Sequence, residues 1–308
     1  MLASPPMRYR YLTADIFTDR PFGGNPLAVF PEARGISPQR MQQVARELNL
    51  SETVFVLPPE DPGHTRKIRI FTPGVELPFA GHPTVGTALI LAWIGEISLA
   101  GEETRIVFEE GVGPVPVTIR AAEGKAVFAQ LSAAQLPEFG PAPAVPDLAE
   151  MLSLDLDDIL TGDEAPQAVS CGVAFLYVPL RDRDALRRAR LRMDRWESLL
   201  ASSWAPSVYV FTRDHGLPET DFRARMFAPA MGIPEDPATG GAAAAFGGYL
   251  GSRSSADGTL RWVLEQGFEM GRPSLLHLEV DRAGGAITAV RVGGGAVQVA
   301  EGVMEIPD

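Results

Sequence analysis

The sequence has one cysteine and four histidines, and this scarcity excludes several classes of site. Cys171 is the only cysteine in 308 residues, so the chain can form neither an intrachain disulfide nor a four-thiolate metal site. A pair of catalytic thiols, as a two-base racemase can use, is excluded for the same reason. The four histidines show no H-E-x-x-H or comparable ligand spacing. The sequence therefore predicts no metal.

Basic residues are also scarce, since 27 Lys and Arg stand against 39 Asp and Glu, for a formal net charge of −12. Nucleic acid and anionic membrane surfaces need a basic face, so neither is an expected partner. The most apolar stretch, "TALILAWIGEISLA", is broken by Gly95 and Glu96, well short of the roughly 20 residues that span a bilayer. The first residues, "MLASPPMRYRYLT", lack the apolar run of a signal peptide. We expect a cytoplasmic protein.

What the sequence does contain is typical of a globular protein, with 45% hydrophobic and 21% charged residues, and its length allows two domains. Ser37 and Pro38 predict the start of a helix that Asn49 can end. "TVGTALILAW" is apolar on all sides, which predicts a helix enclosed by other elements. The charged segment 182–202 is expected to form one amphipathic helix.

Three blocks of the sequence recur in the same order at nearly constant spacing. "SETVFV" matches "APSVYV" at a distance of 154 residues, and "IRIFTP" matches "ARMFAP" at 156. "HPTVGTA" matches "DPATGGA", again at 154. Such a repeat is too long for a solenoid and indicates a duplicated domain. We predict an α/β fold of the α+β type, with strands around one apolar helix in each copy.

The Pro/Ala-rich passage "LPEFGPAPAVPDLAE" is the expected boundary between the two copies. The predicted domains are residues 1–130 and 145–289, with a strand near 290–308 that packs back on the first domain.

Each copy places a polar residue and a proline before its apolar helix, His82-Pro83 in one and Asp236-Pro237 in the other. A helix N-terminus favours an anion, and glycines allow close approach. We expect both prolines just inside their helix, where a missing N–H costs nothing. Two such helix ends predict a site for a small carboxylate between the domains. The alternative is that His82 and Asp236 only cap their helices.

Glu52 belongs to one copy only, because Pro206 stands opposite it in the repeat. A single carboxylate that takes a proton and returns it elsewhere suits isomerisation. The alternative is a polar residue at a helix-to-strand turn. "GGNP" lacks the G-x-G-x-x-G spacing and precedes a strand, so dinucleotide binding is not expected. In the predicted strand–turn–strand "EQGFEMGRPS", Arg272 can bind a carboxylate or lie on the surface.

The matching blocks of a known family cover nearly the whole chain, in that family's order: "DIFTDRPFGGNPLAVF", "LNLSETVFV", "IFTPGVELPFAGHPTVGTA", "MFAPAMGIPEDPATGGAAAAFGGYL", "EQGFEMGRPS" and "VGGGAVQVAEG". With these blocks the chain resembles the PhzF-like family, named for phenazine biosynthesis, which shares the fold of diaminopimelate epimerase. The resemblance implies two β half-barrels, each around a central helix, with the active site between them. It also implies a homodimer that needs no metal or organic cofactor.

The resemblance further implies roles for individual residues. Glu52 matches the glutamate that acts as acid and base on a dihydro-hydroxyanthranilate-type substrate, and His82 and Asp236 match residues that line the same site. These three are the expected catalytic residues. The expected substrate-binding residues are Ser51, Asn25, Gly81, Gly240 and Gly241.

Gly241 departs from the family's pattern, because the phenazine enzyme has serine there. The leading hypothesis is a cofactor-independent isomerase or epimerase that moves a proton on a small anionic carboxylate. The alternatives are a non-catalytic small-molecule-binding or interaction protein that retains the cleft, and a lyase or hydrolase that uses the same carboxylate.

Overall fold

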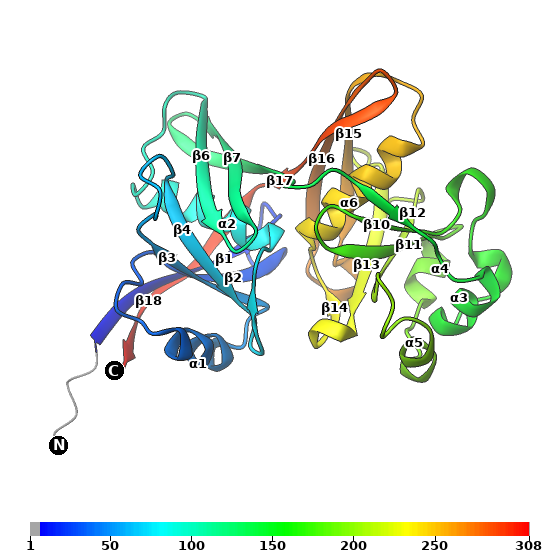
Figure 1. Cartoon of the computed structure of the whole chain (residues 1–308), viewed down its shortest axis with the longest axis horizontal. Helices are drawn as coiled ribbons and strands as arrows, with labels where there is room; N and C mark the ends of the chain where they lie inside the picture. Colours follow the sequence, from blue (N-terminus) through cyan, green and yellow to red (C-terminus); the bar gives the residue numbers. More distant parts are fainter. Residues whose placement is uncertain (1–6, 308) are drawn as a thin grey trace. The chain divides into compact units, whose positions relative to one another are not determined.

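The computed structural model describes residues 7–307, which fall into two compact units (Figure 1). The first unit comprises the described residues up to Ser132 together with those from Gly293 onward, and the second is Ala133–Val292. The strands of the first unit are β1 (Met7–Ile16), β2 (Asn25–Phe30), β3 (Glu52–Leu57), β4 (Arg66–Phe71), β5 (Glu76–Leu77), β6 (Glu103–Glu110), β7 (Gly113–Ala122), β8 (Lys125–Ser132) and β18 (Ala296–Ile306), and its helices are α1 (Pro38–Leu48) and α2 (Gly81–Trp93).

The second unit has its own strands and helices. Its strands are β9 (Glu138–Gly140), β10 (Gln167–Ser170), β11 (Ala174–Pro179), β12 (Ser207–Thr212), β13 (Phe222–Ala228), β14 (Ile233–Asp236), β15 (Gly258–Gln266), β16 (Ser274–Ala283) and β17 (Ala286–Gly294), of which β17 runs across the unit boundary. Its helices are α3 (Val145–Leu152), α4 (Arg183–Arg188), α5 (Met193–Leu199) and α6 (Gly240–Ser252), with short 3₁₀ turns η1 (Leu156–Asp158), η2 (Gly162–Glu164), η3 (Pro229–Met231) and η4 (Phe268–Met270).

The first unit is a curved sheet around α2 (Figure 1). Strands β18, β1, β2, β3, β4, β6, β7 and β8 pair in that order, parallel between β2 and β3 and between β4 and β6, and antiparallel elsewhere. Every residue of α2 from Gly81 to Leu91 is buried. The prediction of an enclosed helix is therefore confirmed, and the physical reason is that no side of α2 is polar enough to face water.

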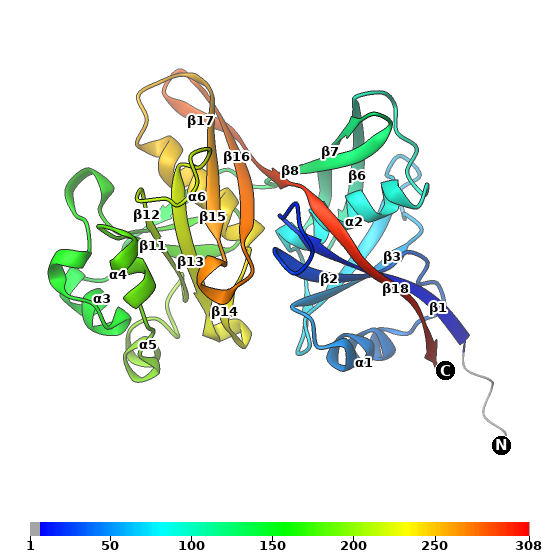
Figure 2. The same cartoon turned by 180° about the vertical axis from the view of Figure 1, so that it is seen from behind.

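Helix α1 lies on the outer face of the same sheet (Figure 2). Its N-cap is Ser37, whose side chain accepts a hydrogen bond from the backbone N–H of Arg40, and Pro38 occupies the first turn. Asn49 ends the helix in the left-handed conformation, with φ of 51°. Both predicted ends of α1 are confirmed. The helix covers an apolar cluster that includes Phe30 and Phe55.

The second unit repeats the connectivity of the first. Strands β10 to β16 pair as β1 to β7 do, with parallel pairs at β11–β12 and β13–β15 and antiparallel pairs elsewhere. Helix α6 follows the short strand β14, just as α2 follows β5. Each unit also adds a strand to its first strand, β18 to β1 and β9 to β10. The predicted duplication is thus confirmed as two half-barrels, each around a central helix.

The two central helices fill their half-barrels in different ways. Helix α6 is built mainly from glycine and alanine. Phe246 is one of its few large side chains and is fully buried. Five aromatic rings pack around Phe246, those of Tyr177, Tyr209, Phe211, Phe222 and Tyr249. The small residues of α6 let the segment around Pro137 approach the helix closely. A Cβ at Gly248 would lie 2.6 Å from the Pro137 side chain.

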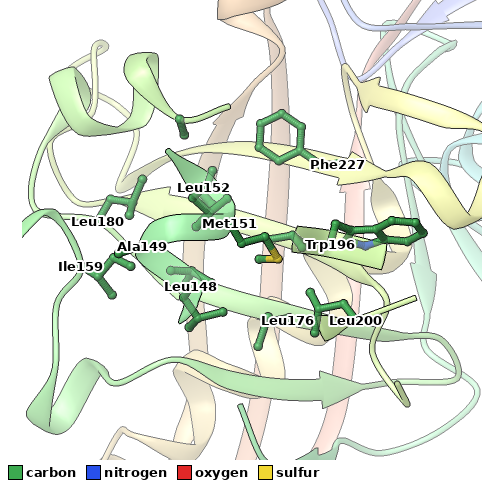
Figure 3. Packing of buried hydrophobic residues seen from close by; sticks show 14 of the residues in the cluster. Leu148, Ala149, Met151, Leu152, Ile159, Leu176, Leu180, Trp196, Leu200 and Phe227 are labelled. Carbon is green, nitrogen blue, oxygen red and sulfur yellow. The ribbon is translucent and has the colours of Figure 1, made fainter. Parts of the chain in front are cut away.

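A second core lies on the other face of the second unit's sheet, beneath α3, α4 and α5 (Figure 3). Trp196 of α5 is buried there, and its indole N–H donates to the carbonyl of Pro206 at 2.8 Å. The labelled residues of this core are Leu148, Ala149, Met151, Leu152, Ile159, Leu176, Leu180, Trp196, Leu200 and Phe227.

The prediction of one helix over residues 182–202 is wrong, because the segment forms α4 and α5 with a break between them. At the break, the N–H groups of Arg190 and Arg192 donate to the carbonyls of Leu152 and Met151 rather than to the preceding turn. The buried guanidinium of Arg225 donates hydrogen bonds to the carbonyl oxygens of Leu186 and Ala189, each at 2.9 Å. These long-range bonds satisfy the backbone groups that a continuous helix would have paired.

No helix within residues 7–307 is long and apolar enough to cross a membrane.

We predict that Arg225→Met lowers the free energy of unfolding by about 3 kcal/mol, because it leaves the Glu235 carboxylate and two helix carbonyls without their buried partner. Chemical denaturation measures this. The matched control is Arg187→Met on α4, where the pair with Asp184 is exposed and its loss costs less than about 0.5 kcal/mol. Equal losses in the two variants would contradict the capping role of Arg225.

Candidate functional site

In the first unit the structure brings Glu52, His82 and Asn25 together. Glu52 is the first residue of β3, Asn25 is the first of β2, and these two strands pair in parallel. His82 lies in the first turn of α2, and its Nε2 is 3.1 Å from Glu52 Oε2. Its Nδ1 lies 3.3 Å from the Asn25 side-chain amide. Only 7% of Glu52 and 4% of His82 is exposed, so the pair is shielded from water.

Each ring nitrogen of His82 faces one polar side chain. With the Asn25 amide assigned as donor, Nδ1 is the acceptor, which leaves Nε2 as the ring nitrogen that can donate toward Glu52. Although Nε2 and Glu52 Oε2 are close, neither makes a hydrogen bond of good geometry with any described residue. Buried polar atoms without a hydrogen-bond partner are uncommon in proteins. This pair can therefore bind a ligand group without first breaking an internal bond.

The N-terminus of α2 adds a positive end to this group. The N-cap of α2 is Ala80, whose side chain cannot cap, so His82 does not cap the helix. The backbone N–H groups of Gly81 and His82 belong to the first turn, where no intrahelical acceptor exists. Thr84 already bonds back to the Ala80 carbonyl. The end of α2 thus offers donors and partial positive charge beside Glu52.

The turn "DRPFGGNP" sets the position of Asn25. The carboxylate of Asp15, which is buried, accepts the backbone N–H of Phe22 at 2.7 Å. Gly24 has φ of 58°, and a Cβ there would lie 2.2 Å from the Ile16 carbonyl oxygen, so only glycine fits. The turn delivers Asn25 directly to the start of β2. Ser51, the residue before Glu52, is half-buried.

The predicted residues of the second unit form a separate group. Asp236 ends β14 and is buried, and its carboxylate accepts the Thr239 hydroxyl at 2.5 Å. Gly240 and Gly241 are the first two residues of α6. Thr239 is the N-cap, so Asp236 does not cap α6. A Cβ added at Gly241 would meet only the Phe175 ring, at 3.9 Å, which leaves room for a small side chain.

Pro237 precedes α6, so the prediction of a proline just inside both helices is right for Pro83 and wrong for Pro237. The reason is that side chains on β15 and β16 take the carbonyls before α6. Gln266 donates to the Asp236 carbonyl at 2.9 Å, and the Ser274 hydroxyl lies 3.0 Å from the Pro237 carbonyl oxygen. The residues before α6 are thus held outside the helix.

Gln266 organises the start of α6 beside Asp236, and the sequence did not single it out. Its side chain is fully buried, donates to the Thr239 hydroxyl at 3.1 Å, and accepts the Thr239 N–H at 3.4 Å and the Tyr209 hydroxyl at 3.3 Å. Burial, with a smaller contribution from the Asp236 charge, raises the pKa of Tyr209 and keeps its hydroxyl a donor. The sequence signal that could have pointed to Gln266 was a glutamine at a predicted strand end in "EQGFEMGRPS". This segment does form the predicted strand, turn and strand.

Among residues 7–307, no group of three or more His, Cys, Asp or Glu side chains is arranged to hold a metal ion. Cys171 is buried, and burial raises the pKa of its thiol to about 12, so it is no thiolate at neutral pH.

Comparison with known sequences gives matches over nearly the whole chain. The family model described as phenazine biosynthesis-like protein matches residues 14–302. An uncharacterized isomerase of Mesorhizobium japonicum is 43% identical over 96% of this chain and 98% of its own. A Pseudomonas aeruginosa protein named trans-2,3-dihydro-3-hydroxyanthranilate isomerase is 35% identical, covering 96% of this chain and 98% of its own.

Comparison with solved structures agrees. A phenazine biosynthesis protein of the PhzF family from Bacillus anthracis superposes with a TM-score of 0.87 at 25% identity, covering 97% of this chain and 100% of the other. A hydroxyproline epimerase from Agrobacterium vitis superposes with a TM-score of 0.63 at 13% identity, covering 98% and 93%. The second likeness concerns the fold alone, which is the diaminopimelate-epimerase-like fold of two half-barrels.

We predict that Gln266→Met lowers the free energy of unfolding by about 3 kcal/mol, because several buried groups that bond its amide lose their partner. Amide hydrogen exchange of residues 238–241 should accelerate more than that of β10. In the control, Gln42→Met, one bond to the Thr72 carbonyl is lost, at a cost of about 1 kcal/mol. Unchanged exchange in 238–241 would refute the organising role of Gln266.

Proposed function

The chain belongs to the phenazine biosynthesis-like family of isomerases, and we propose that Glu52 is its acid and base, moving a proton on a small carboxylate-bearing metabolite. The observation that carries this proposal is the buried pair of Glu52 and His82 at the N-terminus of α2, in which the facing atoms lie 3.1 Å apart and keep spare hydrogen-bonding capacity.

The proposed chemistry is an isomerisation by proton transfer. The Glu52 carboxylate takes a proton from one carbon of the substrate, and the resulting acid returns it to another carbon, so atoms and charge balance. Because no electron pair leaves the substrate, side chains alone can move the proton. While Glu52 holds that proton, it can exchange with solvent. The His82 Nε2–H donates to the oxygen on which negative charge develops, or to Glu52 between the two transfers.

The substrate class follows from the helix N-termini. Removing a proton from carbon next to a carboxylate builds further negative charge, which the first-turn N–H groups of Gly81 and His82 can stabilise. We propose that Gly240 and Gly241 of α6, with Asp236 beside them, contribute to binding the same substrate, which the repeated motif supports. Ser51 stays a predicted substrate contact, and the homodimer stays a prediction.

The first compound to test is trans-2,3-dihydro-3-hydroxyanthranilate, after which the 35% identical relative from Pseudomonas aeruginosa is named. It carries the carboxylate and the mobile proton that the proposal requires.

Glu52→Gln is expected to slow the exchange of substrate C–H for solvent deuterium by about 10²–10⁴-fold, because the amide cannot accept the proton. Mass spectrometry of the substrate in D₂O measures this, and thermal unfolding checks the fold. The matched control is Glu47→Gln, which changes an exposed carboxylate on α1 and should leave exchange unchanged. Exchange at the normal rate in Glu52→Gln would disprove the assignment.

Tight binding without exchange in the unaltered protein would favour a non-catalytic binding function, and a change of product mass would favour a lyase or hydrolase.

Gly241→Ser tests whether this position sets the substrate preference. Because a Cβ fits at residue 241, the variant should keep the stability of the parent to within about 1 kcal/mol. The added hydroxyl at the second residue of α6 should lower the KM for the dihydro-hydroxyanthranilate by several-fold with little change in kcat. Gly241→Ala is the control, since it adds the Cβ without the hydroxyl. Equal KM values for the two variants would show that the hydroxyl at residue 241 does not set the substrate preference.

A further inference from the structure

Glu110, the last residue of β6, is a buried carboxyl group that the proposed reaction does not use. One of its oxygens, Oε1, lies 2.7 Å from the hydroxyl oxygen of Thr84 in α2, and the other makes no hydrogen bond with any residue in 7–307. An ionised carboxylate in this position would hold a buried charge without a partner, which is costly.

The hydroxyl of Thr84 reveals where the proton is. Its oxygen lies 2.8 Å from the carbonyl oxygen of Ala80 and 2.7 Å from Glu110 Oε1. A hydroxyl has one hydrogen and can donate to only one of these two acceptors. The second short contact needs a hydrogen from the other side, and only Glu110 can supply it. The arrangement is satisfied when Glu110 donates to Thr84 and Thr84 donates to Ala80.

The turn between β6 and β7, which follows Glu110, holds the segment that leads into α2 by two further contacts. The backbone N–H of Val112 donates to the Pro78 carbonyl at 3.1 Å. Gly111 lies against Pro78 so closely that a Cβ there would be 2.7 Å from the Pro78 Cα. Residues 110–112 therefore fix both Pro78 and Thr84. The first turn of α2, with His82, lies between these two fixed points.

We propose that Glu110 is a positioning residue that stays protonated at neutral pH and, through Thr84 and Ala80, holds the first turn of α2 so that His82 faces Glu52. The proposal rests on the proposed function only for the task it gives His82. The contacts themselves are independent of any reaction.

The electrostatic surroundings agree with a neutral acid. Burial raises the pKa of Glu110 to about 8, against the opposing effect of the Thr84 hydrogen bond. The titratable groups on the elements around it are His82 on α2, Arg120 on β7, Arg66, Lys67 and Arg69 on β4, and Glu103, Arg105 and Glu109 on β6. Arg69 pairs with Glu76. Arg66, Lys67 and Arg120 each pair with a glutamate elsewhere, and His82 faces Glu52.

The sign of the pH dependence follows from this pKa. Below about pH 4.5 the carboxyl is protonated in both the folded and the unfolded chain, so it has no effect on the balance. Between that pH and about pH 8, the unfolded chain ionises while the folded chain does not, and the folded state progressively loses stability relative to it. Glu110→Gln keeps a donor for Thr84 and cannot ionise, so it should remove this loss.

The test compares Tm in Glu110→Gln and the unaltered protein from pH 5 to pH 9. The difference should be small at pH 5 and should grow in favour of the variant as pH rises. The matched control is Glu103→Gln, at the other end of β6. Glu103 is exposed and pairs with Arg120, which stays charged throughout this range, so its substitution should change Tm by the same amount at every pH.

The positioning role has its own readout. With four histidines in the chain, the ring signals of His82 can be assigned in nitrogen-15 NMR spectra. In the unaltered protein these signals should shift as Glu110 titrates, and in Glu110→Gln that shift should vanish. Glu110→Met, which has no donor, should displace them already at pH 6.

A Tm difference that is constant with pH, or His82 signals that follow the same pH curve with and without Glu110, would overturn the proposal. Neither measurement uses activity, so a failure here is distinct from a failure of Glu52 as the acid and base.

Discussion

The enclosure of one apolar helix on every side is the constraint on which each unit depends. Neither α2 nor α6 has a polar face, so each must be surrounded by strands that curl around it. A helix buried in this way meets polar groups only at its ends, where its backbone N–H and C=O groups lack intrahelical partners. The fold thus creates an electropositive N-terminus surrounded by strand ends, and the side chains of Glu52 and Asn25 come from those strand ends.

The two units meet this constraint with opposite distributions of volume. In the first, leucine and isoleucine project from α2, and the second supplies its bulk from strand tyrosines and phenylalanines that enclose a helix of small residues. Duplicated sequences can diverge in this way because a core requires total volume and close packing rather than particular residues. The chemistry has diverged as well, since Glu52 has no carboxylate opposite it at Pro206.

Features with local causes could be predicted from the sequence, and features with distant causes could not. The ends of α1 follow from Ser37 and Asn49, and the burial of α2 follows from its composition. The break between α4 and α5 involves Arg225 of β13. The start of α6 at Gly240 rather than before Pro237 involves Gln266 of β15. Both are polar side chains on strands remote in sequence. Nothing beside these residues in the sequence signals such bonds. The repeat pointed to His82 and Asp236 by position, and the internal bonds of each group came only from the structure.

The pairing of β18 with β1 has a consequence for synthesis of the chain. The first unit is completed by a strand from the far end of the sequence, and the whole second unit is translated in between. Domains tend to fold as they emerge from the ribosome, so the second unit, being continuous, can finish before the first. Until β18 arrives, β1 presents an open strand edge, which is a template for pairing with other chains. The half-barrel that carries Glu52 and His82 is begun first and closed last.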